Sequence, residues 1–195
     1  MMVAEEICKQ LSDREIVKKS LADIDYFSCL YDRYEPRLFR YIKRIALVND
    51  EQAHDILQEA FIKIWRNLND FDQSLKLSSW IYRIVHNETV SYWRKQKSFG
   101  KDREVKLNID LFDNTSRDLE THEDQEQNDE LTHEVLELLP LKYKTVLVLK
   151  FMEDMSYHEI SDILKIPEGT VATWINRAKN IFMKVAADKH ISFFN

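Results

Sequence analysis

Three residues near the middle of the chain have the types and spacing needed to hold a single nucleic-acid base. Trp80, Arg83 and Asn87 stand at i, i+3 and i+7, so on a helix they share one face. Phe71 lies in the polar loop before them. An aromatic ring stacks on an unstacked base, while a guanidinium and an amide bond its edge. The set predicts capture of an extruded base, although Trp80 taken alone fits a core position at a helix start equally well.

Aromatic and basic residues follow at the end of the same predicted helix. Lys and Arg side chains hold phosphates and position a protein on nucleic acid without reading its sequence. We therefore expect the basic members of this group to contact the phosphate backbone. The group consists of Tyr92, Trp93, Arg94, Lys95 and Lys97.

A four-residue motif in the last third of the chain marks the start of a helix. The hydroxyl of Ser156 can accept from the amide of Glu159, whose carboxylate can accept from the amide of Ser156 in return. This capping box predicts a helix from Tyr157 that breaks before Pro167, and a second helix that begins near Glu168. Two helices joined by a tight turn are typical of the helix-turn-helix motif.

The second helix of this motif turns a small, polar, aromatic and basic face outward, which suits the major groove of DNA. From this segment alone, the alternative is a helical hairpin whose outer face is merely solvated. The outward residues are Gly169, Thr170, Thr173, Trp174, Asn176, Arg177 and Lys179.

An acidic and amide face is expected on a helix at about residues 50–68. Asp55, Gln58 and Glu59 stand at i, i+3 and i+4, opposite the apolar stripe of that helix. Without further information, such a face is simply exposed to solvent.

The composition favours an all-α fold. The chain has 195 residues, enough for one medium domain or two small ones, with only 2 Gly and 3 Pro. Hairpin-rich folds and Gly-looped nucleotide-binding folds depend on those residues, so the composition argues against both.

The net charge of −6 argues at first against a nucleic-acid partner, but the charge is unevenly spread. Residues 101–137 contain 4 basic and 13 acidic residues, a balance of −9, so the rest of the chain sums to +3. This polar, weakly patterned stretch predicts a solvated, flexible linker between two small helical domains.

The expected domain order follows from these patterns. An N-terminal extension at 1–22 precedes a helical domain at 23–98, an acidic linker at 99–130, the helix-turn-helix domain at 131–188 and a tail at 189–195.

Inside the first domain, the helix from Phe27 either runs on or opens a second segment at Pro36. The third helix is expected from Trp80 to about Lys97, with Ser78 or Ser79 as its N-cap.

Cysteine usage and hydropathy predict a cytoplasmic protein. Cys8 and Cys29 form no C-x-x-C pair and lie outside any His cluster, so we expect two reduced thiols. No apolar run approaches the roughly 18 residues of a membrane span, and Glu5 and Glu6 do not suit a signal peptide. The 6 His are scattered. No metal site, cofactor or catalytic residue is expected.

Two ordered blocks of the sequence resemble a known family. Residues 53–65, 79–87 and 92–95 are similar to the first conserved domain of bacterial sigma factors of the extracytoplasmic-function (ECF) type. Leu139-Pro140, the capping box and residues 167–171 resemble the second domain of that family. The resemblance covers about 22–98 and 130–186, in the order of the family.

The resemblance implies a protein that binds core RNA polymerase, directs it to promoters and promotes strand opening, while the polymerase performs the chemistry. The first domain would be of the sigma region 2 type and the second of the region 4 type. Docking on the polymerase clamp falls to Asp55, Gln58, Glu59 and Lys63. Recognition and melting of the −10 element fall to Phe71, Trp80, Arg83, Asn87, Tyr92, Arg94 and Lys95. Recognition of the −35 element falls to Ser156, Glu168, Gly169, Thr170, Thr173, Trp174, Arg177 and Lys179. An anti-sigma factor is a further expected partner, and no membrane insertion is expected.

Two places depart from the family pattern. Ala172 and Trp174 stand where Lys and Arg are common, on either side of Thr173, and Trp174 can face either DNA or the core. Lys165 stands where a turn Gly is common, which costs free energy if the position needs a positive φ.

Two other functions are alternatives to this one. A helix-turn-helix regulator that acts on an existing holoenzyme leaves residues 25–98 without a role. A helical enzyme or scaffold leaves the capping box and the basic second helix without a role.

Overall fold

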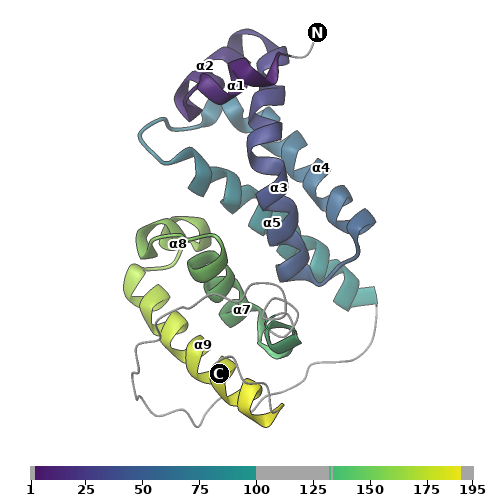
Figure 1. Cartoon of the computed structure of the whole chain (residues 1–195), viewed down its shortest axis with the longest axis vertical. Coiled ribbons are helices and arrows are strands. Elements are labelled where there is room, and N and C mark those ends of the chain that lie inside the picture. Colours follow the sequence, from purple (N-terminus) through teal and green to yellow (C-terminus); the bar gives the residue numbers. More distant parts are fainter. Residues whose placement is uncertain (1–2, 100–131, 133, 190–195) are drawn as a thin grey trace. The chain divides into compact units, whose positions relative to one another are not determined.

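The structure is all-helical in its described parts, as the composition predicted. The computed structural model describes residues 3–99, 132 and 134–189, with only the backbone at 96–99, and every regular element in these ranges is a helix. The chain divides into two compact units, one built mainly on α1–α5 and the other mainly on α7–α9 (Figure 1). The predicted acidic linker lies outside the described residues apart from its first residue.

The N-terminal extension is folded, which the sequence analysis did not predict. It forms α1 (Glu5–Gln10) and α2 (Asp13–Ala22). A capping box starts α2, because Ser12 accepts from the amide of Glu15 and the Glu15 carboxylate accepts from the amide of Ser12. The same motif predicts the helix at Tyr157, so the local signal was present here as well.

The helix from Phe27 is a single element, α3 (Phe27–Ala46), with Pro36 inside it. Of the two alternatives, the continuous helix is therefore confirmed and a second segment at Pro36 is wrong. Pro36 is exposed, and so is Asp32, the residue whose carbonyl loses its helical partner, so water can reach that part of the helix. On the opposite side, Tyr34 and Leu38 are both buried and keep the apolar face continuous across the proline.

Two further helices complete the first unit and pack with α3. The helix α4 (Asp50–Asn67) begins at the predicted residue, and a capping box of Asn49 and Gln52 starts it. The last helix, α5 (Leu77–Phe99), begins three residues earlier than predicted. Ser78 and Ser79 thus lie in its first turn and neither is the N-cap. The three helices bury Leu30, Leu38, Tyr41, Ile42, Ile56, Leu57, Ile64, Ile81 and Val85.

The second unit contains the predicted helix-turn-helix. Pro140 caps α7 (Leu141–Leu147), which widens into the π-helical turn η3 (Val148–Met152). Then follow α8 (Tyr157–Leu164) and α9 (Glu168–Asp188), which begin at the predicted residues. The inner face of α9 packs on α7. That face consists of Val171, Ile175, Ala178, Ile181 and Val185.

A disulfide joins Cys8 and Cys29, so the expectation of two reduced thiols is wrong for this structure. The two Cα atoms are 5.0 Å apart, although 21 positions separate them in sequence. Folding of α1 against α3 creates this proximity. Cysteine spacing alone gives no sign of it, because the pair forms no local motif.

Burial of His86 makes the stability of the first unit sensitive to acid. The Tyr41 hydroxyl lies 2.8 Å from Nδ1 of His86, and burial, aided by Arg94, lowers the pKa of His86 to about 4. The unfolded chain therefore binds a proton at a pH where the folded protein does not.

We predict full stability above about pH 6.5 and a loss of up to about 3 kcal/mol as the pH falls from 6.5 to 4. Denaturant unfolding at several pH values measures this loss. His86→Gln keeps a polar partner for Tyr41 and should flatten the dependence in this range. An equal slope in both proteins would contradict the assignment.

Candidate nucleic-acid interface

The loop between α4 and α5 is closed at its base by an aromatic pair. The loop comprises residues 69–76 and begins within the short helix η2 (Leu68–Asp70). The ring centroids of Phe71 and Trp80 are 5.2 Å apart, and each side chain keeps only 8% exposure. Inside the loop, the Asp72 carboxylate accepts from the amide of Ser74 at 2.9 Å, and this bond lowers the pKa of Asp72.

The predicted base-capturing residues fall into a buried and an accessible pair. Phe71 and Trp80 pack against each other, so in this conformation they support the loop and offer no open ring face. Arg83 is partly exposed and Asn87 is exposed, one helical turn apart on α5. The polar edge-binding groups are thus the ones that a base could reach first.

The predicted phosphate-binding residues continue along α5. Arg94 and Lys95 are exposed, whereas Tyr92 is partly buried. Asn87 and Lys95 are eight positions apart, so they lie along the same side of the helix. A strand of nucleic acid that reached Asn87 could therefore also meet the cations near the end of α5.

The outer face of α4 is exposed at every predicted docking residue. Asp55, Gln58, Glu59 and Lys63 all face solvent. Lys63 also forms an ion pair with Glu88 of α5, at 2.6 Å between Nζ and Oε1.

An apolar groove, which the sequence analysis missed, lies beside this polar face. Its rim includes exposed apolar side chains, with Ile24 at 61%, Tyr31 at 39% and Ile62 at 37% exposure. Ile62 falls outside the buried stripe of α4, and that was the available sequence signal. The groove is lined by Ile24, Phe27, Tyr31, His54, Gln58, Phe61, Ile62 and Trp65.

The helix-turn-helix is held by polar contacts at both helix starts. The capping box at α8 is present, with the amide of Ser156 donating to Glu159 at 2.9 Å. Nδ1 of His158 lies 2.8 Å from Oε1 of Glu168 and so links the start of α8 to that of α9. Lys165 in the turn has a φ of 56°, the positive value that the sequence analysis considered.

The N-terminal half of α9 carries an exposed stripe without apolar residues. Gly169, Thr173 and Arg177 are spaced four apart and all are exposed, and Thr173 Oγ1 donates to the Gly169 carbonyl at 2.8 Å. A Cβ on Gly169 would meet no atom within 4 Å. Nothing in the chain itself therefore requires a glycine there.

Three other predicted residues of α9 are less accessible. Trp174 is partly buried, with Nζ of Lys142 at 5.8 Å from its ring centroid. Thr170 is partly buried as well. Lys179 is also partly buried, and its Nζ lies 5.2 Å from the ring centroid of Phe151. Trp174 thus divides its surface between the core and solvent.

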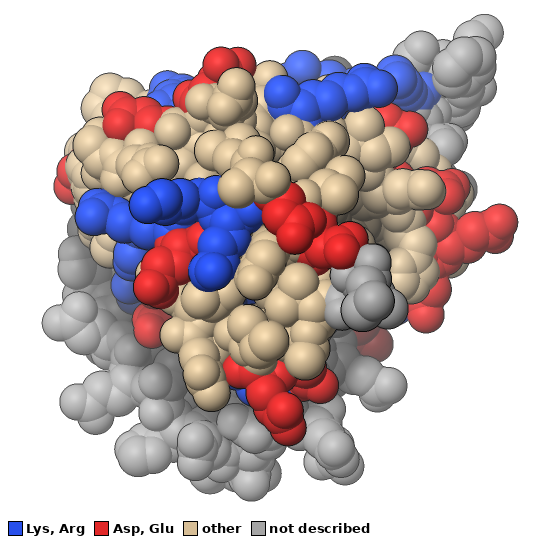
Figure 2. All heavy atoms as spheres, turned by 90° about the horizontal axis from the view of Figure 1, so that it is seen from above, with Lys and Arg blue, Asp and Glu red and all other residues tan. Residues whose placement is uncertain are grey.

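Charge is mixed on the face seen in Figure 2, which looks down on the α1–α2 end of Figure 1. Lys and Arg side chains form separate groups there, with Asp and Glu beside them. This face therefore has no continuous basic surface.

The described residues also contain no group of three or more His, Cys, Asp and Glu side chains that could hold a metal ion.

Comparison with known proteins identifies the family. A model of Sigma-70 region 2 matches residues 30–99, and a model of Sigma-70, region 4 matches residues 129–180. The ECF RNA polymerase sigma factor SigW of Bacillus subtilis is 36% identical over 178 residues, covering 88% of this chain and 94% of SigW. The chain belongs to the ECF sigma factors. It therefore directs RNA polymerase to promoters and is not itself an enzyme.

Further relatives agree with this sigma factor in sequence and in fold. The ECF RNA polymerase sigma-E factor of Haemophilus influenzae is 29% identical over 183 residues, covering 90% of this chain and 95% of that protein. The structure of CnrH in complex with the cytosolic domain of CnrY superposes with a TM-score of 0.68 at 19% identity, covering 90% and 97% of the two chains. Of the helices described in our sigma factor, none has the length and apolar character to span a bilayer.

The positive φ of Lys165 gives a stability prediction for the helix-turn-helix. Lys165→Gly should stabilise the second unit by about 1 kcal/mol, because the left-handed conformation costs an L-residue about 1 to 2 kcal/mol while glycine gains freedom in the unfolded chain. Hydrogen exchange of the amides in α8 and α9 should slow about fivefold.

Lys165→Ala is the matched control, because it removes the same charge and stem but keeps a Cβ at a positive φ. Equal protection in the Gly and Ala variants would show that the turn is not strained at this residue.

Proposed function

We propose that the two units of this sigma factor divide promoter recognition. The second unit reads the −35 element through α9, and the first unit binds core polymerase and captures the −10 element. The observation that carries this proposal is the exposed stripe of Gly169, Thr173 and Arg177 on a helix whose start is fixed by the turn and by the His158–Glu168 contact.

The stripe suits a major groove in size and chemistry. A helix enters the groove with its N-terminal residues, and a hydroxyl and a guanidinium both bond base edges or phosphates. Close approach of DNA also explains a glycine that the chain itself does not need. Ser156 and Glu168, both exposed beside this helix start, flank the contact, while Thr170, Trp174 and Lys179 border it.

The −10 element is assigned to α5 and the loop 69–76. Arg83 and Asn87 bond the edge of an extruded base, and Arg94 and Lys95 hold the phosphates next to Tyr92. Phe71 and Trp80 close the loop and supply stacking surface once the loop adjusts to the base. Stacking contributes roughly 1 to 3 kcal/mol per base, which matches the few kcal/mol needed to extrude one.

Core polymerase is assigned to the outer face of α4. Exposed carboxylates, an amide and a lysine provide directed polar contacts, and the apolar groove beside them supplies area that binding would remove from water. An anti-sigma factor is a further proposed partner, since the sigma factor RpoE of Bartonella quintana was crystallised with the anti-sigma factor NepR. A cytoplasmic location follows from action on the polymerase.

Reversing two charges on α4 tests the docking face. Asp55→Lys combined with Glu59→Lys should weaken binding to core polymerase at least about tenfold. The new lysines would repel the polymerase surface to which the two carboxylates are proposed to bind. Fluorescence titration of labelled sigma factor with core enzyme measures the affinity.

Glu5→Lys combined with Glu6→Lys is the matched control, since it reverses two exposed charges on the helix α1, which lines no part of the groove. Equal affinities for the two double variants would remove α4 from the docking site.

Two alanine variants on α5 separate base recognition from phosphate contact. Asn87→Ala should slow promoter opening most at promoters that carry the preferred base in the −10 element. Lys95→Ala should instead weaken binding to all promoters alike and reduce the salt slope of binding by about 1. Run-off transcription from bare core enzyme and a fluorescent base at −10 provide the measurements. The same dependence on −10 sequence in both variants would contradict the division of roles.

A further inference from the structure

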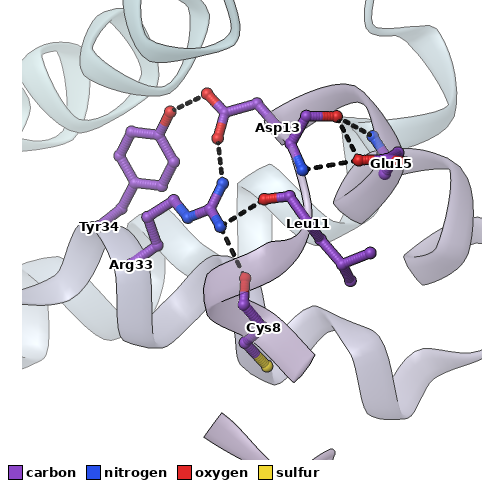
Figure 3. A network of polar contacts seen from close by, with 7 residues as sticks. Cys8, Leu11, Asp13, Glu15, Arg33 and Tyr34 are labelled. Carbon is purple, nitrogen blue, oxygen red and sulfur yellow. Dashed lines mark hydrogen bonds and ion pairs between the residues drawn. The ribbon is translucent and has the colours of Figure 1, made fainter. Parts of the chain in front are cut away.

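The folded N-terminal segment, residues 4–22, is fixed to α3 by one arginine. Nη2 of Arg33 donates to the carbonyls of Cys8 and Leu11, both at 2.7 Å, and Nη1 donates to Oδ1 of Asp13 at 2.7 Å (Figure 3). A single guanidinium thus holds the end of α1, the connection and the start of α2.

The second oxygen of Asp13 is also occupied. The hydroxyl of Tyr34 donates to Oδ2 of Asp13 at 2.6 Å, as Figure 3 shows, and Tyr34 is only 5% exposed. Burial raises the pKa of Tyr34, and the bond to Asp13 adds to this effect. The first residue of α2 is therefore held at both carboxylate oxygens by α3.

The residue after this anchor reaches the loop between α4 and α5. Nη2 of Arg14 donates to the backbone carbonyl of Gln73 at 3.2 Å, across 59 positions of sequence. In addition, α2 packs against η2, which leads into the loop 69–76. The loop therefore touches the N-terminal segment at its start and near its middle.

We propose that Arg14 is a positioning residue for promoter opening, which holds the loop 69–76 in the form that receives the −10 base. Because Arg14 binds a backbone carbonyl, it restrains the path of the loop whatever side chain stands at position 73. This inference rests on the proposed role of the loop in −10 capture.

A series at Arg14 tests the positioning role in the full-length holoenzyme. Arg14→Ala should slow opening about threefold to tenfold, the effect of losing one hydrogen bond of this kind, and Arg14→Lys should restore much of the rate. Lys18→Ala removes the same charge from an exposed position of α2 and should leave the rate unchanged. Affinity for core polymerase should be equal in all three variants.

The controls separate failure of this inference from failure of the proposed function. Equal opening rates for Arg14→Ala and Lys18→Ala, alongside a defect in Asn87→Ala, would overturn the role of Arg14 alone. Normal opening in Asn87→Ala as well would instead remove the loop region from −10 capture. A defect in Arg14→Ala that Arg14→Lys rescues supports the inference.

A different observation, the disulfide, carries a second proposal, whose route to the loop rests on Arg14. It ties α1 at Cys8 to α3 at Cys29, and the two residues are 6% and 1% exposed. A helix of six residues is not stable by itself. Without the disulfide, α1 is retained mainly by Arg33 and by packing, so the anchoring of the segment depends on the redox state of the pair.

We propose that Cys8 and Cys29 form a thiol–disulfide switch with hydrogen peroxide as the oxidant. One thiolate attacks the peroxide, its O–O bond breaks, and a sulfenic acid and hydroxide form; the hydroxide takes a proton to give water. The second thiolate then attacks that sulfur, the S–S bond forms, and the released hydroxide takes a proton to give a second water. A dithiol reductant reverses the change. The oxidised form holds the segment firmly, and the reduced form loosens it.

Oxidised and reduced sigma factor, each freed of reagent before it meets core polymerase, provide the test. The oxidised protein should open the promoter about threefold faster, whereas Cys8→Ser should match the reduced protein under both treatments. In Arg14→Ala the redox response should disappear, because the segment then no longer acts on the loop.

Thiol titration accompanies the kinetics. Two thiols that remain after peroxide treatment, or equal opening by the oxidised and reduced proteins, would overturn the switch. A redox response that persists in Arg14→Ala would overturn its route through the loop.

Discussion

The first unit depends on one continuous buried face of α3. Side chains from Leu30 to Ile45 keep helical spacing across Pro36, and α2, α4 and α5 all pack on this helix. Burial of such side chains contributes roughly 1.5 to 3 kcal/mol each, which outweighs the hydrogen bond that the proline removes. Because α4 and α5 meet on α3, the loop between them has fixed ends, and its aromatic base closes where those helices converge.

In the function proposed for this sigma factor, recognition relies on a few placed residues and not on broad charge. The chain carries a net charge of −6, and its acids are concentrated in residues 101–137. The exposed cations and polar groups of α5 and α9 stand instead in short helical stripes. Such stripes provide directed contacts while nonspecific attraction to DNA stays weak, which suits a subunit that acts on promoters together with polymerase.

Helical spacing predicted the faces of the candidate site but not their depth. Trp80, Arg83 and Asn87 share a side of α5 as expected, yet Trp80 is buried against Phe71 while Asn87 is exposed. Depth depends on what the neighbouring loop covers, and a periodic pattern contains no information on that. For the same reason, the sequence did not decide whether Trp174 faces DNA or the core. The structure shows it partly buried beside Lys142.

By itself, the sequence determined what local chemistry controls: the all-helical class, the capped starts of α4 and α8, and the order of two family motifs. Only the tertiary structure decided that Cys8 meets Cys29, and that Arg14 reaches Gln73. Helix caps and hydrophobic periodicity involve residues a few positions apart, so they can be recognised in the sequence. Contacts across 21 and 59 positions exist only after whole helices have packed, and they place the N-terminal segment against the loop.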